Sequence, residues 1–164
     1  PPGTYTVHLS GVGGTTGVGL VEVYDADEDT SGSKLINVSA RAQVGVGEEI
    51  LIPGFVLGGD GPRRLLVRAV GPGLGQFGVT GFLENPQLIV YQGGAPIDGN
   101  DDWGANTDVA AIQAATTAVG AEPLAAESLD AALLVQLEPG AYTVHVRGVG
   151  DTEGVALVEV YVVD

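Results

Sequence analysis

The sequence predicts an all-β protein: a β-sandwich of about nine or ten strands with immunoglobulin-like or Greek-key connections and one short helix. Apolar runs of strand length recur along the chain, and turns rich in Gly and Pro separate them. Glycine accounts for 27 of the 164 residues, and apolar residues make up 45% of the chain, which is enough to fill one core. These observations favour a compact β fold over a disordered or fibrous chain.

The first predicted element is a β-hairpin within residues 4–24. Apolar and polar residues alternate in residues 4–11, as in a half-buried strand, and a Gly-rich turn leads to a second apolar run. An isolated two-stranded hairpin is marginal in water, so its apolar face must dock on a sheet. The residues expected to mediate this docking and assembly are Tyr5, Val7, Leu9, Leu20, Val21 and Val23.

An acidic, polar segment follows the predicted hairpin. Residues 25–33 read DADEDTSGS, a composition that is typical of a linker. The sequence therefore divides into an N-terminal hairpin, residues 1–27, and a β-sandwich domain, residues 28–164.

The strands of the sandwich are predicted from alternation and from their turns. Alternation is clearest in residues 36–44, which predicts a strand with one buried face. The next apolar run is interrupted at Pro53-Gly54, which indicates a bulge or bend because Pro cannot donate a ladder hydrogen bond. Further strands are expected at residues 63–71, 86–94 and 128–137, and a final hairpin at 140–163.

One segment changes to a helical period, which predicts a short helix near 107–119 across an end or face of the sandwich. Its apolar residues at this spacing are Val109, Ile112 and Val119. Asn106 or Thr107 is the expected N-cap, and Gly120 is expected to end the helix.

The two ends of the chain carry the same segment. Residues 2–27 align on residues 139–164 without a gap, and 18 of the 26 positions are identical. The offset is 137 residues, far longer than the roughly 20 to 50 residues of solenoid repeats. The chain therefore contains one domain-sized period and an extra copy of its closing piece.

The charge excludes several classes of partner. The formal net charge is −15, with one Lys and five Arg, so neither nucleic acid nor an anionic membrane surface is an expected partner. No apolar run approaches 18 residues, so membrane insertion is not expected. With no Cys, the chain has neither a disulfide nor a thiolate site.

The titratable residues do not form a catalytic motif, so no enzyme activity is expected. His8 and His145 are the only histidines, and they occupy equivalent positions on the two copies without a converging nucleophile and acid. Both are interpreted as solvated strand residues. Glu22 and Glu159 interrupt the LVEVY runs and are expected to face a cross-strand Arg, such as Arg68 or Arg147.

No cofactor is required, but two acidic clusters are candidates for calcium. Asp98, Asn100 and Asp102 have the alternating oxygen spacing of a calcium loop. An EF-hand would have Gly and Glu where Trp103 and Val109 stand, so an Asx-rich turn with Trp103 at the core edge is the alternative. The second cluster has the same spacing and is either a calcium site or solvated acid. It consists of Asp25, Asp27 and Asp29.

Four segments together resemble a family of β-rich domains that occur, often in tandem, in large secreted or surface proteins of bacteria. They read PGAYTVHVRGVGDTEGVALVEVY, LINVSARAQVGVGEEILIPGFVLGG, RRLLVRAVGPGLGQFGV and NDDWG. The resemblance covers residues 34–164 in one pass and residues 2–27 as the tail of a preceding copy. It implies an exported, repetitive, extracellular domain and no catalytic residue.

Two functions remain open at this point. In the first, the protein is a structural subunit that assembles with identical subunits into an extracellular fibre or surface layer by strand addition from its N-terminal hairpin. In the second, it is a spacer or ligand-binding module, as in adhesins, of a larger secreted surface protein. The hairpin docks on its own sandwich, docks on a neighbouring subunit, or is the remnant of a preceding repeat.

Overall fold

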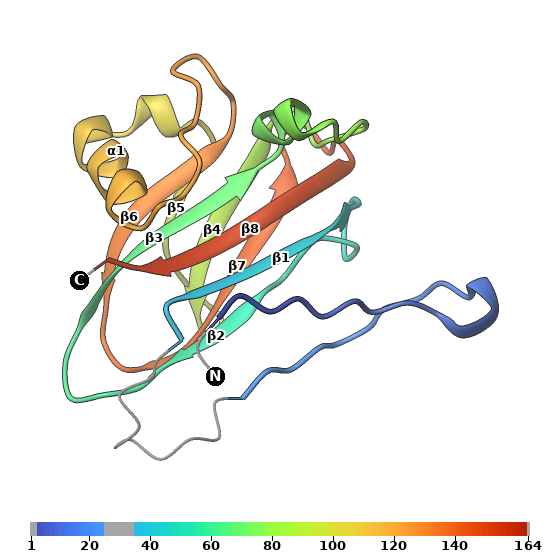
Figure 1. Cartoon of the computed structure of the whole chain (residues 1–164), viewed down its shortest axis with the longest axis horizontal. Helices are drawn as coiled ribbons and strands as arrows, with labels where there is room; N and C mark the ends of the chain where they lie inside the picture. Colours follow the sequence, from blue (N-terminus) through green and yellow to red (C-terminus); the bar gives the residue numbers. More distant parts are fainter. Residues whose placement is uncertain (1–2, 25–34, 164) are drawn as a thin grey trace. The chain divides into compact units, whose positions relative to one another are not determined.

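The structure of the protein is a computed structural model, which describes residues 3–24 and 35–163. The chain divides into two compact units between Leu35 and Ile36. The second unit is a β-sandwich of two four-stranded antiparallel sheets (Figure 1). The predicted fold class is confirmed, with eight strands in the described residues where nine or ten were expected.

In the first sheet the strands lie in the order β1-β8-β3-β6, and in the second in the order β2-β7-β4-β5. The strands of the first sheet are β1 (Asn37–Val44), β8 (Gly154–Val162), β3 (Arg63–Val70) and β6 (Ala131–Leu137). Those of the second are β2 (Gly54–Leu57), β7 (Gly140–Gly148), β4 (Pro86–Gln92) and β5 (Ala95–Asn100).

The main core lies between the two sheets and is built by alternate residues of each strand. Val144 of β7 and Leu65 of β3 are fully buried there, and Val158 of β8 is 1% exposed. The strand is interrupted at Pro53-Gly54, since β2 begins at Gly54 and Leu51 forms an isolated bridge. The predicted bulge or bend is wrong, because Leu51 and Gly54 pair with Val146 and Thr143 of β7 in one continuous register.

A second, smaller core lies on the outer face of the first sheet, under the helix α1 (Val109–Ala118) (Figure 1). Trp103 begins a short 3-10 turn, η4 (Trp103–Ala105), and packs with Ile112 against Leu66 of β3. This second layer explains why residues 65–70 are buried without interruption. Trp103 is therefore buried at the edge of the core, where the Asx-rich turn proposed as the alternative to a calcium loop places it.

The ends of α1 confirm one predicted cap and correct the other. The carboxylate of Asp108 accepts a hydrogen bond from the Ala111 N–H at 2.9 Å, so Asp108 and not Asn106 or Thr107 caps the helix. Asn106 instead donates to backbone carbonyls and ties the turn to β6. Gly120, with φ 69°, ends the helix as predicted.

The predicted hairpin at 140–163 is wrong, because β7 and β8 belong to different sheets. β7 pairs with β2 and β4, whereas β8 pairs with β1 and β3. The two strands face each other across the core and are joined by a turn that crosses from one sheet to the other. We call residues 140–162 the closing arch. Alternation shows that each strand has a buried face but does not show which strands pair, so it cannot distinguish a hairpin from an arch.

The N-terminal hairpin is also not formed as a pair of strands. Within residues 3–24 the structure assigns no strand and only a 3-10 turn, η1 (Val12–Gly14). The reason lies in its counterpart: the arms of the closing arch hydrogen-bond to four other strands and not to each other. A copy of these arms without those strands has no ladder to join. We call residues 3–24 the N-terminal arch.

A candidate assembly segment

The six residues predicted to mediate docking are all exposed in the N-terminal arch. Their side chains are between 45% (Val21) and 80% (Leu20) exposed. Five of them correspond to core residues of the closing arch that are at most 8% exposed: Tyr142, Val144, Val146, Val158 and Val160. Leu20 differs, because its counterpart Leu157 points to the outer face of the sheet. The N-terminal arch therefore presents to solvent the side chains that the sandwich uses as its core.

The turns of the two arches have the same backbone conformation. Gly13 and Gly14 have φ of 68° and 76°, and their counterparts Gly150 and Asp151 have 70° and 56°. In each turn a Thr hydroxyl donates to the carbonyl oxygen three residues earlier, Thr15 at 3.2 Å and its counterpart at 3.1 Å. The turn is thus a local property of the repeated sequence and does not require the sheets.

The first arms also begin in the same way. In both arches a Tyr ring folds back over the Gly two residues earlier, so that a Cβ built on Gly3 or Gly140 would lie 3.6 Å from that ring. In the sandwich, Tyr142 also stacks on Phe55 with 5.6 Å between ring centroids and donates a hydrogen bond to the Glu138 carbonyl at 2.8 Å. These contacts fix the start of β7 against β2.

One pair of core residues differs between the arches in a compensating way. Val146 and Ala156 belong to the main core, whereas the N-terminal arch has Leu9 and Gly19 in their places. Leu9 and Gly19 are neighbours, because a Cβ built on Gly19 would lie 2.5 Å from Leu9 Cδ2. One arm gains a methylene group and the facing arm loses a methyl group, so the volume between the arms is conserved.

The outer face of the closing arch contains a buried ion pair. Glu159 Oε2 lies 3.2 Å from Arg68 Nε, and the Arg68 side chain is 2% exposed. Tyr161 donates a hydrogen bond to Glu159 at 2.6 Å, and Arg68 donates to the Glu122 carbonyl at 2.7 Å. Burial raises the pKa of Tyr161 well above its usual range, and the hydrogen bond to the carboxylate raises it further. The predicted pairing of Glu159 with Arg68 is confirmed, as the two residues lie directly opposite in β8 and β3.

The N-terminal arch has the acidic half of this arrangement. Tyr24 donates a hydrogen bond to Glu22 at 2.8 Å, which raises the pKa of Tyr24, and both side chains are exposed. Glu22 thus holds the position of the carboxylate that Arg68 meets in the sandwich.

The first candidate calcium cluster is not a loop. Residues 95–100 form the edge strand β5, and the Asn100 amide bridges to the other sheet by accepting a hydrogen bond from the Ala132 N–H at 2.9 Å. Its nitrogen donates to the Asp102 carbonyl at 3.0 Å, and Asp98 accepts from the Gly99 N–H at 2.8 Å. Asn100 is therefore committed to the fold. Asp25, Asp27 and Asp29 lie outside the described residues, and within the described ranges no three His, Asp or Glu side chains gather as a metal site.

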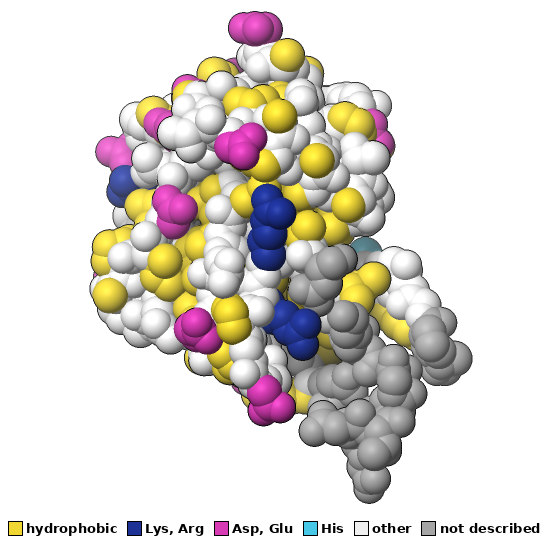
Figure 2. All heavy atoms as spheres, turned by 90° about the vertical axis from the view of Figure 1, so that its left-hand side faces the viewer, with side chains coloured by type: hydrophobic (Ala, Val, Ile, Leu, Met, Phe, Trp, Pro, Cys, Tyr) yellow, Lys and Arg dark blue, Asp and Glu magenta, His cyan; other side chains and the backbone are white. Residues whose placement is uncertain are grey.

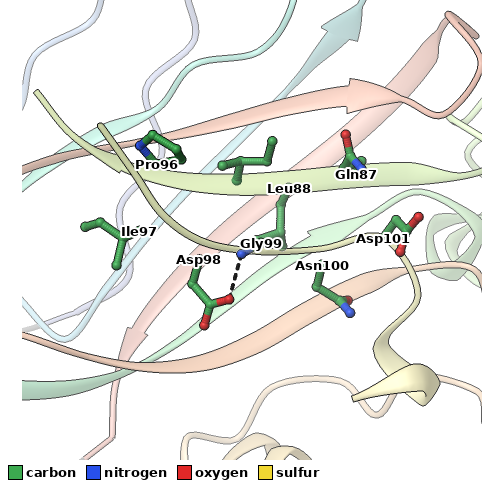
Figure 3. A pocket seen from close by; sticks show the side chains of 9 residues that line it. Gln87, Leu88, Pro96, Ile97, Asp98, Gly99, Asn100 and Asp101 are labelled. Atoms are coloured by element: carbon green, nitrogen blue, oxygen red, sulfur yellow. Dashed lines mark hydrogen bonds between the residues drawn. The ribbon is translucent and has the colours of Figure 1, made fainter. Parts of the chain in front are cut away.

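A depression of about 420 Å³ lies along β4 and β5 and has no histidine in its lining. Figure 3 shows Leu88 and Gln87 of β4 beside the run Pro96–Asp101, with the hydrogen bond from the Gly99 N–H to Asp98 drawn. His145 lies elsewhere, with its ring 4.3 Å from that of Tyr91, and burial lowers its pKa. His8 is exposed on the N-terminal arch. In the parts of the chain that the structure describes, no nucleophile, base and acid converge.

Sequence reasoning missed one buried acid with a structural role. Asp130 is fully buried, and its carboxylate accepts hydrogen bonds from the N–H groups of Gly71 at 2.7 Å and Gly73 at 3.1 Å. Ser128 donates to the same carboxylate. The Gly-rich loop after β3 is therefore anchored to the start of β6, and its glycines allow close approach of the backbone there.

On the face shown in Figure 2, acidic side chains lie singly among apolar and polar atoms, and the few basic side chains form no broad patch. No helix in the described residues is long and apolar enough to cross a membrane.

No protein-family model matches the chain, and no curated protein matches it. Among solved structures, the chain is similar to the pre-peptidase C-terminal domain of collagenase from Bacillus anthracis. The two share 9% sequence identity and a TM-score of 0.46, over 76% of this chain and 89% of that chain.

Proposed function

We propose that the protein is a non-enzymatic structural subunit of an extracellular fibre or surface layer, joined to identical subunits by its N-terminal arch. One observation carries the proposal: the N-terminal arch displays, at 45% to 72% exposure, five side chains whose counterparts form the sandwich core. Exposed side chains of this kind gain free energy when another surface covers them, at roughly 25 cal/mol per Å².

The number of arches supports a contact between subunits. Each chain has two arches, and its sandwich has room for one arch between β1 and β3 and between β2 and β4. In every chain, one of the two arches therefore cannot occupy the position between these strands. A free arch on one subunit and an acceptor edge on the next form a heterologous contact, and repetition of that contact gives an open filament.

The acceptor in this proposal is the edge formed by β1 and β2, the outermost strands beside the closing arch. Exposed apolar residues lie on or next to these strands: Ile36 (60% exposed), Ile52 (48%) and Val56 (76%). Two arms that add to β1 and β2 extend both sheets by main-chain hydrogen bonds, with alternate side chains setting the register. The net charge of −15 suits a secreted, soluble subunit.

Deletion of residues 1–27 tests the proposal. We expect the full chain to form regular filaments under negative-stain electron microscopy and the truncated chain to remain a folded monomer. Val7→Asp is expected to prevent filaments as well, because it places a charge in the apolar contact. Val12→Asp is the matched control: Val12 is 92% exposed at the tip of the turn, and its substitution should leave filaments intact. Filaments of unchanged form from the truncated chain would refute the assembly role.

The second candidate function is a spacer or ligand-binding module of a larger secreted surface protein. The offset of 137 residues favours it, because the N-terminal arch then closes a preceding copy of the sandwich. The test is a chain with an additional copy of residues 28–138 placed before residue 2. Two folded sandwiches without filaments would support the module, whereas persistent filaments would support the subunit.

We also propose that the protein is not a hydrolase. The support is the placement of His145 on β7, where its ring packs against that of Tyr91. Purified chain is expected to turn over neither ester, peptide nor glycoside substrates. Turnover that disappears in the His145→Ala variant would overturn this proposal.

A further inference from the structure

We propose that the N-terminal arch is a second closing arch for the same sandwich, able to take the place of β7 and β8 in its own chain. We call that place the slot: it lies between β2 and β4 in one sheet and between β1 and β3 in the other. This inference goes beyond assembly, since it concerns the fold of one chain.

The side chains that the slot selects are present on both arches. Tyr5, Val7 and Leu9 stand for the buried Tyr142, Val144 and Val146, and Val21 and Val23 stand for Val158 and Val160. Cores reject changes in volume and tolerate volume-conserving exchanges. The exchange of Val146 and Ala156 for Leu9 and Gly19 conserves volume, so the N-terminal arch offers the slot about the same core.

The buried cation of the slot is also satisfied by either arch. Arg68 is 2% exposed and needs a carboxylate beside it, because a buried unpaired charge is strongly unfavourable. Glu22 occupies the position of Glu159, and Tyr24 already donates to it as Tyr161 donates to Glu159. An arch with an apolar residue at this position would leave Arg68 uncompensated.

At the end of the arch, Asp25 stands in the sequence where the partly buried Val162 packs at the edge of the main core. Two further differences lie on the surface. Arg147 donates to Gln87 at 2.8 Å in an exposed contact, and Ser10 would replace it. Thr16 replaces Glu153, which is exposed. Losses of this kind are small for solvent-exposed pairs.

The chain is long enough to reach its own slot. Tyr161, at the end of the closing arch, lies directly opposite Asn37 of β1. Its counterpart Tyr24 is followed by residues 25–36 before β1 begins. A segment of that length spans up to about 40 Å when extended, whereas adjacent strands are only about 5 Å apart. A tether this short gives an effective concentration in the millimolar range, which favours the slot of the same chain over that of a neighbour.

The test weakens the closing arch in the full-length chain. Val144→Asp places a carboxylate in the main core and is expected to expel the closing arch. If the N-terminal arch fills the slot, this variant keeps its β circular dichroism, the emission of its buried Trp103, cooperative unfolding and a monomeric size. The double variant Val7→Asp/Val144→Asp is expected to unfold, and Val7→Asp alone is expected to match the original sandwich.

An engineered disulfide identifies the occupant. Gln87 of β4 lies opposite Arg147 of β7, and the counterpart of Arg147 is Ser10. Because β4 is an inner strand, addition of an arch to the edge at β1 and β2 cannot bring Ser10 beside it. The chain has no Cys, so Ser10→Cys with Gln87→Cys gives a single pair. We expect an intrachain disulfide in the Val144→Asp background, more slowly in the milder Val144→Ala background, and none when Val7→Asp is added.

Three results would overturn the inference: a Val144→Asp chain as unfolded as the double variant, a folded one without the intrachain disulfide, or a disulfide-linked dimer. Filament formation is not measured in this experiment. If the assembly proposal fails, the result of this experiment is therefore unchanged. If this experiment shows that the N-terminal arch does not fill the slot, the assembly proposal still stands.

Discussion

At the scale of single residues, the sandwich depends on two buried charges that are satisfied in different ways. Asp130 receives backbone N–H groups of the loop after β3, and Arg68 meets the Glu159 carboxylate and the Glu122 carbonyl. The sequence predicted the Arg68 pair, because a Glu in an apolar strand indicates an Arg on the neighbouring strand. It did not predict the role of Asp130, since one Asp before a strand does not indicate which backbone N–H groups will donate to it.

We expect Glu159→Gln to lower the free energy of unfolding by about 3 kcal/mol, because Arg68 is left buried without a counter-charge. Urea unfolding measures the change. Glu22→Gln removes the same residue from the same LVEVY context on an exposed arm and should leave the urea midpoint unchanged. Equal destabilisation by the two substitutions would contradict the assigned role of the ion pair.

The burial of Tyr161, together with its hydrogen bond to Glu159, predicts an alkaline limit of stability. The folded pKa of Tyr161 is raised above its unfolded value of 10.0, so the unfolded chain releases this proton first as pH rises. Its contribution is complete below about pH 10 and is lost above it. Thermal melts between pH 9 and 12 should show a steeper loss for the original chain than for Tyr161→Phe. Parallel curves would exclude Tyr161 as the titrating group.

At the scale of elements, periodicity predicted where strands with one buried face lie, but it did not predict which strands pair. The alternation of residues 36–44 corresponds to β1, and the helical spacing near 107–119 corresponds to α1. β5 was missed because Pro96 and Gly99 are unfavourable in strands, although an edge strand tolerates them. The arms of both arches were assigned to hairpins because only tertiary pairing distinguishes an arch. The sequence predicted that the apolar face of residues 4–24 docks on a sheet, but it predicted neither the exposure of the six assembly residues nor the slot that fits them.

The turn of the closing arch requires glycine at one position. A Cβ on Gly148 would overlap the backbone carbonyl and hydroxyl of Thr152. We expect Gly148→Ala to destabilise the sandwich by about 2 kcal/mol, through displacement of the turn that joins β7 to β8. Gly11→Ala makes the same clash with Thr15 in the N-terminal arch and should leave the melting temperature of the sandwich unchanged. Differential scanning calorimetry measures both melting temperatures. Equal shifts for the two variants would contradict the role of Gly148 in the turn of the sandwich.

At the scale of the whole molecule, composition predicted the class of fold and the charge. It did not predict the different roles of the N-terminal arch and the sandwich. A net charge of −15 on 164 residues opposes compaction by self-repulsion. We therefore expect the melting temperature to rise from 10 to about 150 mM NaCl, where the Debye length falls from roughly 30 to 8 Å. A melting temperature that is independent of salt would show that the charges are too dispersed to interact.

The calcium hypothesis for Asp25, Asp27 and Asp29 predicts an additional, ion-specific effect. A ligand of the native state stabilises it by mass action, so millimolar calcium should raise the melting temperature above that in magnesium at equal ionic strength. The triple Asp→Asn variant should lose this difference and keep the response to NaCl. Identical melts in calcium, magnesium and chelator would remove the hypothesis.

The position of the closing arch has a consequence for the order of events during synthesis. Among the described strands, β7 and β8 are the last to leave the ribosome, yet they occupy inner positions in both sheets. Asn37 must therefore wait for a hydrogen-bond partner 123 positions later in the chain. Contacts so distant in sequence form slowly, and until they form, β1 to β4 expose unpaired edges beside the empty slot. The N-terminal arch has emerged long before. If the N-terminal arch takes the slot as proposed, it also covers these edges in the nascent chain until the final strands are complete.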